Sequence, residues 1–187
     1  MTKFILLLLF PLSLFANLRP VPWLTEEAIS YLDRYLEENC NARILEFGSG
    51  ASTVWFAKRT KNLISIEHDA SWHHLIKETI DNGFNYGAKL ILLPKPYYSI
   101  ANLFPDEYFD LILVDGRNRK GCILHAIRTL KRGGVLMLDN AERPYYKKAI
   151  ELLEGWKATS AVQNKPDSCN FSIQTGQQAG GLNLRDC

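Results

Sequence analysis

The sequence has little imbalance of charge, and this limits what the protein can bind. Its 187 residues include 22 Lys and Arg against 20 Asp and Glu, a formal net charge of +2, and no run of basic residues. Nucleic-acid-binding proteins usually carry a basic patch or stripe, so the composition argues against a nucleic-acid partner. The chain also lacks an internal repeat and a long low-complexity segment. Its length suits one domain with a full hydrophobic core.

Cysteine is scarce, and no two cysteines lie close together in the sequence. The four are Cys40, Cys122, Cys169 and Cys187, and none belongs to a CxxC pair. This spacing argues against a zinc site. In an exported chain, a disulfide between Cys169 and Cys187 could hold the tail; buried or inert thiols are an equal alternative. The spacings do not decide between them.

The N-terminus differs in composition from the rest of the chain. Residues 1–16, MTKFILLLLFPLSLFA, combine the basic Lys3 with an apolar run and end at the small Ala16. This layout predicts a secretory signal peptide or an N-terminal membrane anchor, and therefore an exported or membrane-associated protein. An uncleaved segment on a cytoplasmic protein is the alternative. Residues 17–175 are expected to form the domain, and the tail 176–187, rich in Gly, Gln and Asn, to be loosely ordered.

Apolar runs alternate with helical patterns along the domain. Helices are expected over 25–38, 52–59, 71–81, 120–130 and 145–153. Strands are expected over 43–47, 62–69, 88–94, 109–116, 134–140, 157–162 and 169–175. Strands that are apolar throughout are typical of a parallel sheet buried on both faces. The pattern predicts a Rossmann-like, doubly wound α/β fold with helices on both faces. Its mainly parallel sheet would have about seven strands, the last two forming an antiparallel edge pair.

The turn after the first strand is the feature most informative about a ligand, because such sheets bind ligands beyond the carboxyl ends of their strands. It meets only half of the GxGxxG pattern, with Gly48 and Gly50 followed by Thr53. Glu46 would repel a pyrophosphate but favour a cationic group, and S-adenosylmethionine carries a sulfonium and an ammonium without a phosphate. Glu67, nineteen residues after Gly48, is placed to accept hydrogen bonds from a ribose diol. Each feature alone could be an ordinary strand end, but together they favour a nucleoside site over a nicotinamide site.

The segments ILEFGSGAST, LISIEHD, FDLILVDGR and LKRGGVLMLDN, in this order, resemble the class I S-adenosylmethionine-dependent methyltransferases over roughly residues 42–140. In that family the acid and glycines of the first turn hold the methionine end of the cofactor, and the acid that ends the second strand holds the ribose. The usual acid after the third strand is missing from LLPKPYY. The cofactor site implied by the resemblance consists of Glu46, Gly48, Ser49, Gly50, Glu67, His68 and Asp115.

A finer resemblance to the catechol-type O-methyltransferases concerns a metal ion. It implies that Asp115, Asp139 and Asn140 hold Mg²⁺, which would lower the pKa of an acceptor hydroxyl. Asp115 and Asp139 would then be the catalytic residues. The base lysine of those enzymes is replaced here by Asn118, with Lys120 nearby. In the alternative interpretation, the two aspartates cap helices or bind polar groups of the cofactor.

The remaining polar residues at the same strand ends suggest an acceptor site. Arg117, Arg143 and Tyr145 are expected to hold an anionic or sugar-like substrate, with a solvated charged loop as the alternative. The predicted function is methyl transfer to a small-molecule acceptor, at oxygen. Because S-adenosylmethionine is made in the cytosol and the N-terminus suggests export, a non-catalytic exported module that binds a nucleoside or an anion is the alternative. With little beyond the core sheet, the chain could rely on a second subunit in a homodimer to close its pocket.

Overall fold

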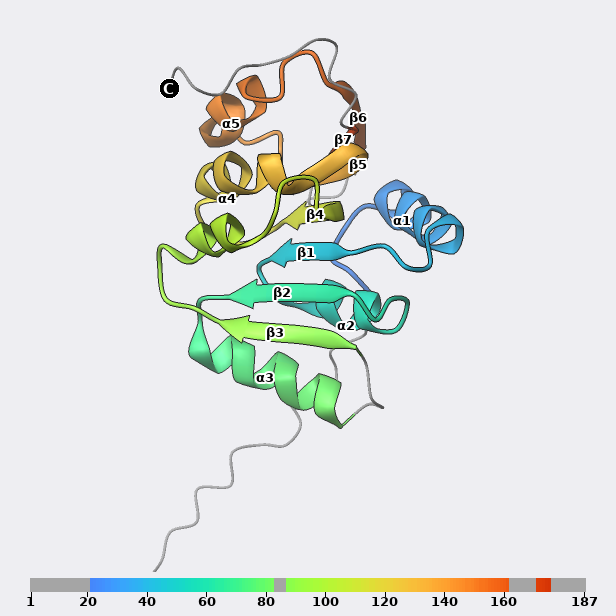
Figure 1. Ribbon diagram of the computed structural model, residues 1–187, viewed down its shortest axis with the longest axis vertical. Coiled ribbons are helices and arrows are strands. Elements are labelled where there is room, and N and C mark those ends of the chain that lie inside the picture. Colours follow the sequence, from blue (N-terminus) through green and yellow to red (C-terminus); the bar gives the residue numbers. More distant parts are fainter. Residues whose placement is uncertain (1–20, 83–86, 162–170, 176–187) are drawn as a thin grey trace, which may run out of the picture.

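The structure, a computed structural model, describes residues 21–82, 87–161 and 171–175 (Figure 1). The predicted leader (1–16), the predicted tail (176–187) and the suggested pairing of Cys169 with Cys187 lie outside these ranges. No helix among the described residues is long and apolar enough to cross a membrane.

A sheet with the strand order β3-β2-β1-β4-β5-β7-β6 runs through the domain. Strands β1 to β5 are parallel to one another. The strand β7 pairs antiparallel with β5, and β6 pairs antiparallel with β7. The predicted Rossmann-like α/β fold with a mainly parallel sheet is confirmed. The strands are β1 (Ile44–Phe47), β2 (Leu63–Glu67), β3 (Ala88–Leu92), β4 (Phe109–Val114), β5 (Leu130–Asp139), β6 (Lys157–Ala161) and β7 (Phe171–Thr175).

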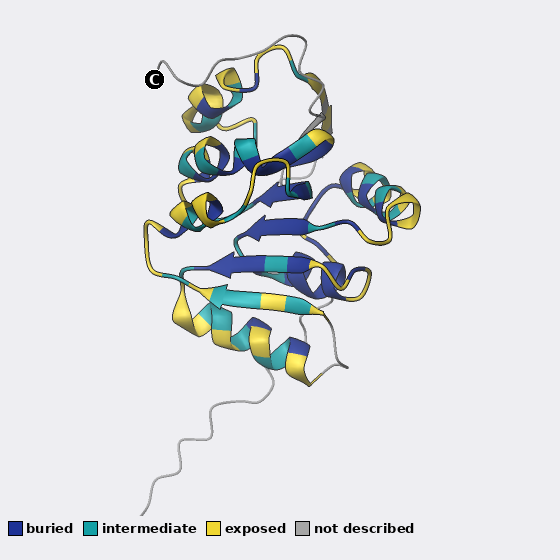
Figure 2. Cartoon of the chain, in the orientation of Figure 1, coloured by how far each residue is buried: buried dark blue, intermediate teal, exposed yellow. Residues whose placement is uncertain are grey.

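Helices cover both faces of the sheet. The helices are α1 (Glu26–Glu38), α2 (Ala51–Ala57), α3 (Ala70–Asp81), α4 (Arg119–Ala126) and α5 (Lys147–Glu151), with 3-10 helices η2 (Tyr97–Leu103), η3 (Ile127–Thr129) and η4 (Pro144–Tyr146). Neighbouring residues of a strand point to opposite faces, so Ile44 packs with residues of α1 and α2, while Leu45 belongs to the core under η2, α4 and α5. Figure 2 shows β1 buried along its length and the edge strand β3 partly exposed.

Two predicted helices differ from the structure near the C-terminal half of the sheet. The helix expected over 120–130 ends earlier, and β5 begins at Leu130 and contains Gly133 and Gly134. These glycines do not stop the helix. They lie where the register of β4 and β5 shifts, and Gly133 has a φ of 76° that suits a local irregularity of the strand. The helix expected over 145–153 is divided into η4 and α5.

Two glycine turns meet at the carboxyl ends of β1 and β4. Gly48 follows β1 with a φ of 95°, and a Cβ placed on it would lie 2.6 Å from the amide nitrogen of Gly116, which follows β4. A Cβ on Gly116 would in turn lie 3.0 Å from the amide nitrogen of Gly48 and would collide with the hydroxyl of Tyr97. The two strand ends therefore approach this closely only because neither residue has a side chain.

Replacing Gly48 should destabilise the fold more than replacing a glycine that has only an unusual φ. Gly48→Ala combines positive-φ strain with a backbone clash, and we expect it to lower the free energy of unfolding by about 2–4 kcal/mol. Gly133→Ala is the matched control, because Gly133 also has a positive φ but has no atom within 4 Å of an added Cβ. It should lose only about 1 kcal/mol. Urea denaturation measures both, and equal losses would show that the close approach of the turns is unimportant.

Candidate active site

The predicted cofactor residues lie together where the strand order of the sheet reverses. The strand order reverses between β1 and β4, so the helix after β1 and the helix after β4 leave on opposite faces of the sheet. A crevice at such a switch point is the usual ligand site of an open α/β sheet. The carboxyl ends of β1 and β2 bring together Glu46, Ser49 and Glu67, and those of β4 and β5 bring together Asp115 and Asp139.

Glu46 lies beneath the first turn and does not face solvent. It is completely buried, and three hydroxyl groups donate hydrogen bonds to its carboxylate. Ser52 donates to Oε1 at 2.5 Å, while Thr53 and Ser65 donate to Oε2 at 2.6 and 2.5 Å. The Thr53 hydroxyl also accepts the amide of Gly50 at 2.7 Å. Glu46 thus ties α2 to β1 and β2, which is a different role from the direct ligand contact that the sequence suggested.

Burial changes the protonation of Glu46. Loss of solvent raises the pKa of its carboxyl from 4.5 to about 7. The hydrogen bonds from Ser52, Ser65 and Thr53 oppose this shift, and the nearby charge of Glu67 adds to it. The turn that shapes the cofactor site therefore rests on a carboxyl that titrates near neutral pH.

Glu67 holds the same turn from the end of β2. Its Oε2 accepts the amide of Ser49 at 3.0 Å, and its Oε1 accepts the amides of His68 and Asp69 at 2.7 and 2.9 Å. The Nδ1 atom of His68 also lies 2.8 Å from Oε1. Because Oε2 receives only one of these amides, it keeps an acceptor site for a further donor. This free acceptor site is what binding of a ribose hydroxyl requires.

Two aromatic side chains that were not among the predicted site residues support this acidic end. Tyr97, in η2, is buried and stacks on the ring of His68 with 5.4 Å between centroids. Its hydroxyl donates to the backbone carbonyl of Arg117, which connects the ends of β2 and β4. The indole nitrogen of Trp72 donates to the carbonyl of Ser49. Nothing in the spacing of these aromatic residues distinguishes them from ordinary core residues.

Arg119 is a buried cation between the two aspartates. Its NH2 group donates to Oδ1 of Asp115 at 2.9 Å, and its NH1 group donates to Oδ2 of Asp139 at 3.1 Å. Burial and the neighbouring carboxylate of Asp139 raise the pKa of Asp115, whereas Arg119 acts in the opposite direction. Arg119 stands two residues after the predicted substrate residue Arg117, but only 8% of its side chain is exposed.

The magnesium ligands implied by the sequence meet an obstacle in this arrangement. Asp115 and Asp139 do lie together, as predicted, and Asn140 is buried directly after Asp139. However, one oxygen of each aspartate is already bound to Arg119. Divalent ions bind oxygen ligands and are repelled by a guanidinium. The donor set therefore does not fit a metal ion while Arg119 remains in place.

The three predicted substrate residues lie at the surface of the same edge. Arg117 and Arg143 are exposed in the loops that follow β4 and β5, and Tyr145 is 75% exposed. Tyr145 packs against Tyr146 with perpendicular rings 5.4 Å apart, and Tyr146 in turn lies near the guanidinium of Arg119. Within the described ranges, no hydrogen bond, ion pair or ring contact joins these side chains to the cofactor turn, so their role in binding an acceptor stays a prediction.

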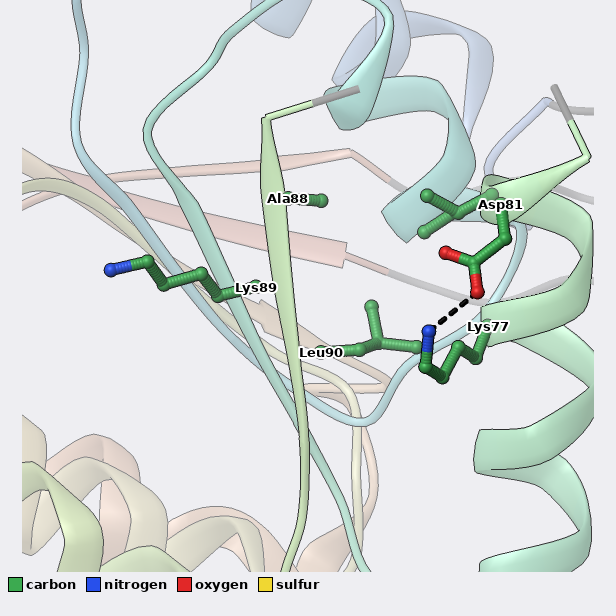
Figure 3. A pocket seen from close by; sticks show the side chains of 6 residues that line it. Lys77, Asp81, Ala88, Lys89 and Leu90 are labelled. Atoms are coloured by element: carbon green, nitrogen blue, oxygen red, sulfur yellow. Dashed lines mark hydrogen bonds and ion pairs between the residues drawn. The ribbon is translucent and has the colours of Figure 1, made fainter. Parts of the chain in front are cut away.

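A hollow of about 260 Å³ lies away from this edge, between α3 and the first residues of β3 (Figure 3). Lys77 and Asp81 form an ion pair of 2.5 Å across its rim, and both side chains are more than half exposed. An exposed pair of this kind contributes little binding energy. The lining offers no buried polar group, so the strand-end site remains the better candidate. The lining residues are Lys77, Ile80, Asp81, Ala88, Lys89 and Leu90.

Known proteins share this fold. The family model described as a methyltransferase domain matches residues 45–141. A protein assigned as an O-methyltransferase from Klebsiella pneumoniae superposes with a TM-score of 0.68 at 21% identity, covering 82% of this chain and 81% of its own. A protein assigned as a caffeoyl-CoA O-methyltransferase from Staphylococcus aureus gives 0.66 at 18% identity, covering 88% and 90%. A protein assigned as a methyltransferase from Streptococcus mutans, in complex with SAH, gives 0.59 at 12% identity, covering 78% and 97%.

The sequence matches no curated protein. The reversed strand order and the acid-and-glycine turn define the class, which is that of the class I S-adenosylmethionine-dependent methyltransferases. The chain belongs to the family of methyltransferase domains, because the family model covers more than half of its length. It is therefore an enzyme that uses S-adenosylmethionine, and the non-catalytic alternative is set aside.

The stability of the protein should depend on the proton of Glu46. The folded-state pKa of about 7 lies above the ordinary value of 4.5, so the folded chain holds an extra proton between these pH values. The stability that this proton contributes is complete below pH 4.5 and is lost as the pH rises through 7. Relative to Glu46→Gln, the wild-type free energy of unfolding should fall by about 3 kcal/mol between these limits.

Chemical denaturation of both proteins at a series of pH values measures this difference. Asp115 is present in both proteins, and the charge of Glu46 is the smallest of the effects on its pKa, so most of its titration is common to the two. A constant difference between the wild type and Glu46→Gln across the range would show that Glu46 is ionised throughout.

Proposed function

We propose that the enzyme transfers the methyl group of S-adenosylmethionine to an oxygen atom of a small acceptor that is anionic or sugar-like. The observation that carries this proposal is the meeting of two acidic groups at one edge of the sheet. Glu67 lies beside the first glycine turn, and the Asp115–Asp139 pair lies across the switch point. The first arrangement suits a nucleoside and the second suits a hydroxyl that must lose a proton.

In this proposal the cofactor lies along the turn after β1. The free acceptor site on Oε2 of Glu67 receives a ribose hydroxyl, and His68 lies beside it. A Cβ on Gly50 would have no atom within 4 Å, so the chain leaves open space at this point of the turn. Gly48 and Ser49 shape the turn from within. Glu46 contributes indirectly, because its hydrogen bonds hold the start of α2 against the strands.

The chemistry requires alignment more than activation. When bound, S-adenosylmethionine supplies a sulfonium methyl group that is already reactive. The residues of the chain must place an acceptor oxygen in line with it and accept the proton that this oxygen loses. Asp115, with a third of its side chain exposed, is the carboxylate at the mouth of the site. Its raised pKa makes it a stronger base than an exposed aspartate, while Asp139 stays buried against Arg119.

Charge at the surface supports an acidic acceptor. Arg117 and Arg143 lie in the loops that flank Asp115 and Asp139, and their exposed guanidinium groups are free to bind a carboxylate or a phosphate. Tyr145 offers an exposed ring for a sugar or an aromatic group. The O-methyltransferase assignment of two structural neighbours supports oxygen as the methylated atom.

Two further proposals concern the location and assembly of the enzyme. The composition of residues 1–16 supports export or membrane association, with a cytoplasmic protein as the other outcome. The small number of elements beyond the core sheet supports a homodimer in which a second subunit closes the acceptor side. The intact mass of the chain isolated from its cells and light scattering of the purified protein decide these two points.

Loss of the Glu67 carboxylate should weaken cofactor binding. In Glu67→Ala the ribose loses an acceptor, and the turn after β1 loses its hydrogen bond from the Ser49 amide, so we expect at least about tenfold weaker binding of S-adenosylmethionine. Glu37→Ala is the matched control, because Glu37 is exposed on α1. Calorimetric titration measures both affinities. Unchanged affinity in Glu67→Ala would remove Glu67 from the cofactor site.

Reversing the surface charge should change which acceptors are methylated. Arg117→Glu and Arg143→Glu should each lower kcat/KM for acceptors with a carboxylate or phosphate by about tenfold. Their effect on neutral hydroxyl acceptors should be small. Arg132→Glu, at the opposite end of β5, is the control. The measurement is methyl transfer to a panel of paired charged and neutral acceptors, and equal losses on both kinds would contradict an anionic acceptor.

A further inference from the structure

Arg119 is saturated by hydrogen bonds to two loops. Besides the two aspartate side chains, its NH2 group donates to the carbonyl of Asp115 at 3.0 Å, and Nε donates to the carbonyl of Gly116 at 3.1 Å. Its NH1 group also donates to the carbonyl of Asp139. A guanidinium has five N–H donors, and this one uses all of them on the residues that follow β4 and end β5.

The backbone before α4 directs this side chain inward. Asn118 has a φ of 50°, in the left-handed region, and its side chain caps α4 by accepting the amide of Gly121. Arg119 is therefore the first residue of the helix and turns towards the sheet, whereas Arg117 and Lys120 stay exposed. Among the residues that the structure describes, Arg119 is the one buried basic side chain.

Its position is where a divalent ion would have to bind. Magnesium requires oxygen ligands at about 2.0–2.1 Å in octahedral geometry. It could take the oxygens that now accept NH2 and NH1 only if the guanidinium left its buried position and gave up its five hydrogen bonds. An ion on the other oxygens, including the unpartnered Oδ1 of Asp139, would lie close to the positive charge of Arg119 and be repelled by it.

We propose that Arg119 is an internal cation that takes the place of a divalent metal in this active site. The guanidinium offsets one charge of the carboxylate pair and fixes the ends of β4 and β5 in position, so Arg119 is a positioning residue. If the methyl transfer proposed above is correct, its acceptor does not have to present two adjacent oxygens to chelate a metal. Acceptors that have a single reacting hydroxyl, and that are bound through a carboxylate or phosphate of their own, then fit this site.

The direct test is titration of the wild-type protein with Mn²⁺, which reports binding without any acceptor. We expect no saturable binding up to millimolar Mn²⁺, and EDTA should change neither the midpoint of thermal unfolding nor the affinity for S-adenosylhomocysteine. Saturable Mn²⁺ binding that disappears in Asp139→Asn would overturn the proposal. This outcome does not depend on whether any Arg119 variant folds.

Variants of Arg119 give the complementary result. Arg119→Met leaves two carboxylates without their cation, and we expect the thermal midpoint to fall by roughly 10 °C in metal-free buffer. Millimolar Mn²⁺ should recover at least half of that loss, because the vacated space then offers two carboxylates to an ion. Arg119→Lys keeps the charge with fewer donors and should lose less stability than Arg119→Met without gaining Mn²⁺ binding.

Arg128→Met provides the matched control. Arg128 also donates to several loop carbonyls, those of Ala101, Asn102 and Phe104, but it does not bridge a pair of carboxylates. Its loss should lower the midpoint with no recovery in Mn²⁺. Equal recovery of the two methionine variants would contradict a specific cation site at Arg119.

Calorimetry with S-adenosylhomocysteine separates the two proposals. A wild-type chain that binds neither S-adenosylhomocysteine nor Mn²⁺ would contradict the proposed function and still support Arg119 as the internal cation. A chain that binds both would support the cofactor site and contradict the role of Arg119.

Discussion

The close contact of the turns after β1 and β4 is the constraint on which the rest of the site depends. Gly48 and Gly116 pack backbone against backbone, and neither position has room for a side chain. This contact lies where the strand order reverses, so α2 and α4 diverge from it to opposite faces of the sheet. The crevice between the diverging elements is the place where such folds bind their ligands. Substrate and cofactor chemistry can meet there because both turns end at the same edge.

The same edge concentrates acidic side chains, and the protein stabilises each of them differently. Glu46 is held by three hydroxyl groups, Glu67 by three backbone amides, and the Asp115–Asp139 pair by Arg119. An uncompensated buried charge would cost several kcal/mol, and each of these partners offsets part of that cost. Glu67 keeps acceptor capacity on Oε2, which receives a single amide, and Asp115 has a third of its side chain exposed. Those two carboxylates are therefore the ones that can act on ligands.

Much of the fold could be predicted from the sequence because the strands are short apolar runs with polar residues directly after them. That pattern located Glu67 and Asp115 correctly at strand ends, since parallel strands place their carboxyl ends at one edge. The direction of individual side chains was not predictable. Glu46 sits on the face where Ser52 and Ser65 can reach it, which depends on how α2 packs. The boundary of β5 was missed because its glycines resemble a helix stop and instead accommodate a shift in register.

Arg119 is the clearest example of a side chain whose direction could not be predicted from the sequence. In the sequence it is one of several basic residues in DGRNRK, and nothing in its spacing separates it from Arg117. Asn118, with its left-handed backbone, separates the two, and Arg119 is buried while Arg117 is exposed. No motif marks the residue that alters the expected chemistry.

A crystal structure of the chain grown with S-adenosylhomocysteine would show where the cofactor binds. We predict the nucleoside at the carboxyl ends of β1 and β2, with its ribose hydroxyls on Glu67 and its sulfur facing the Asp115 side of the crevice. A ligand bound instead in the hollow between α3 and β3 would contradict it, and so would a ribose that makes no contact with Glu67.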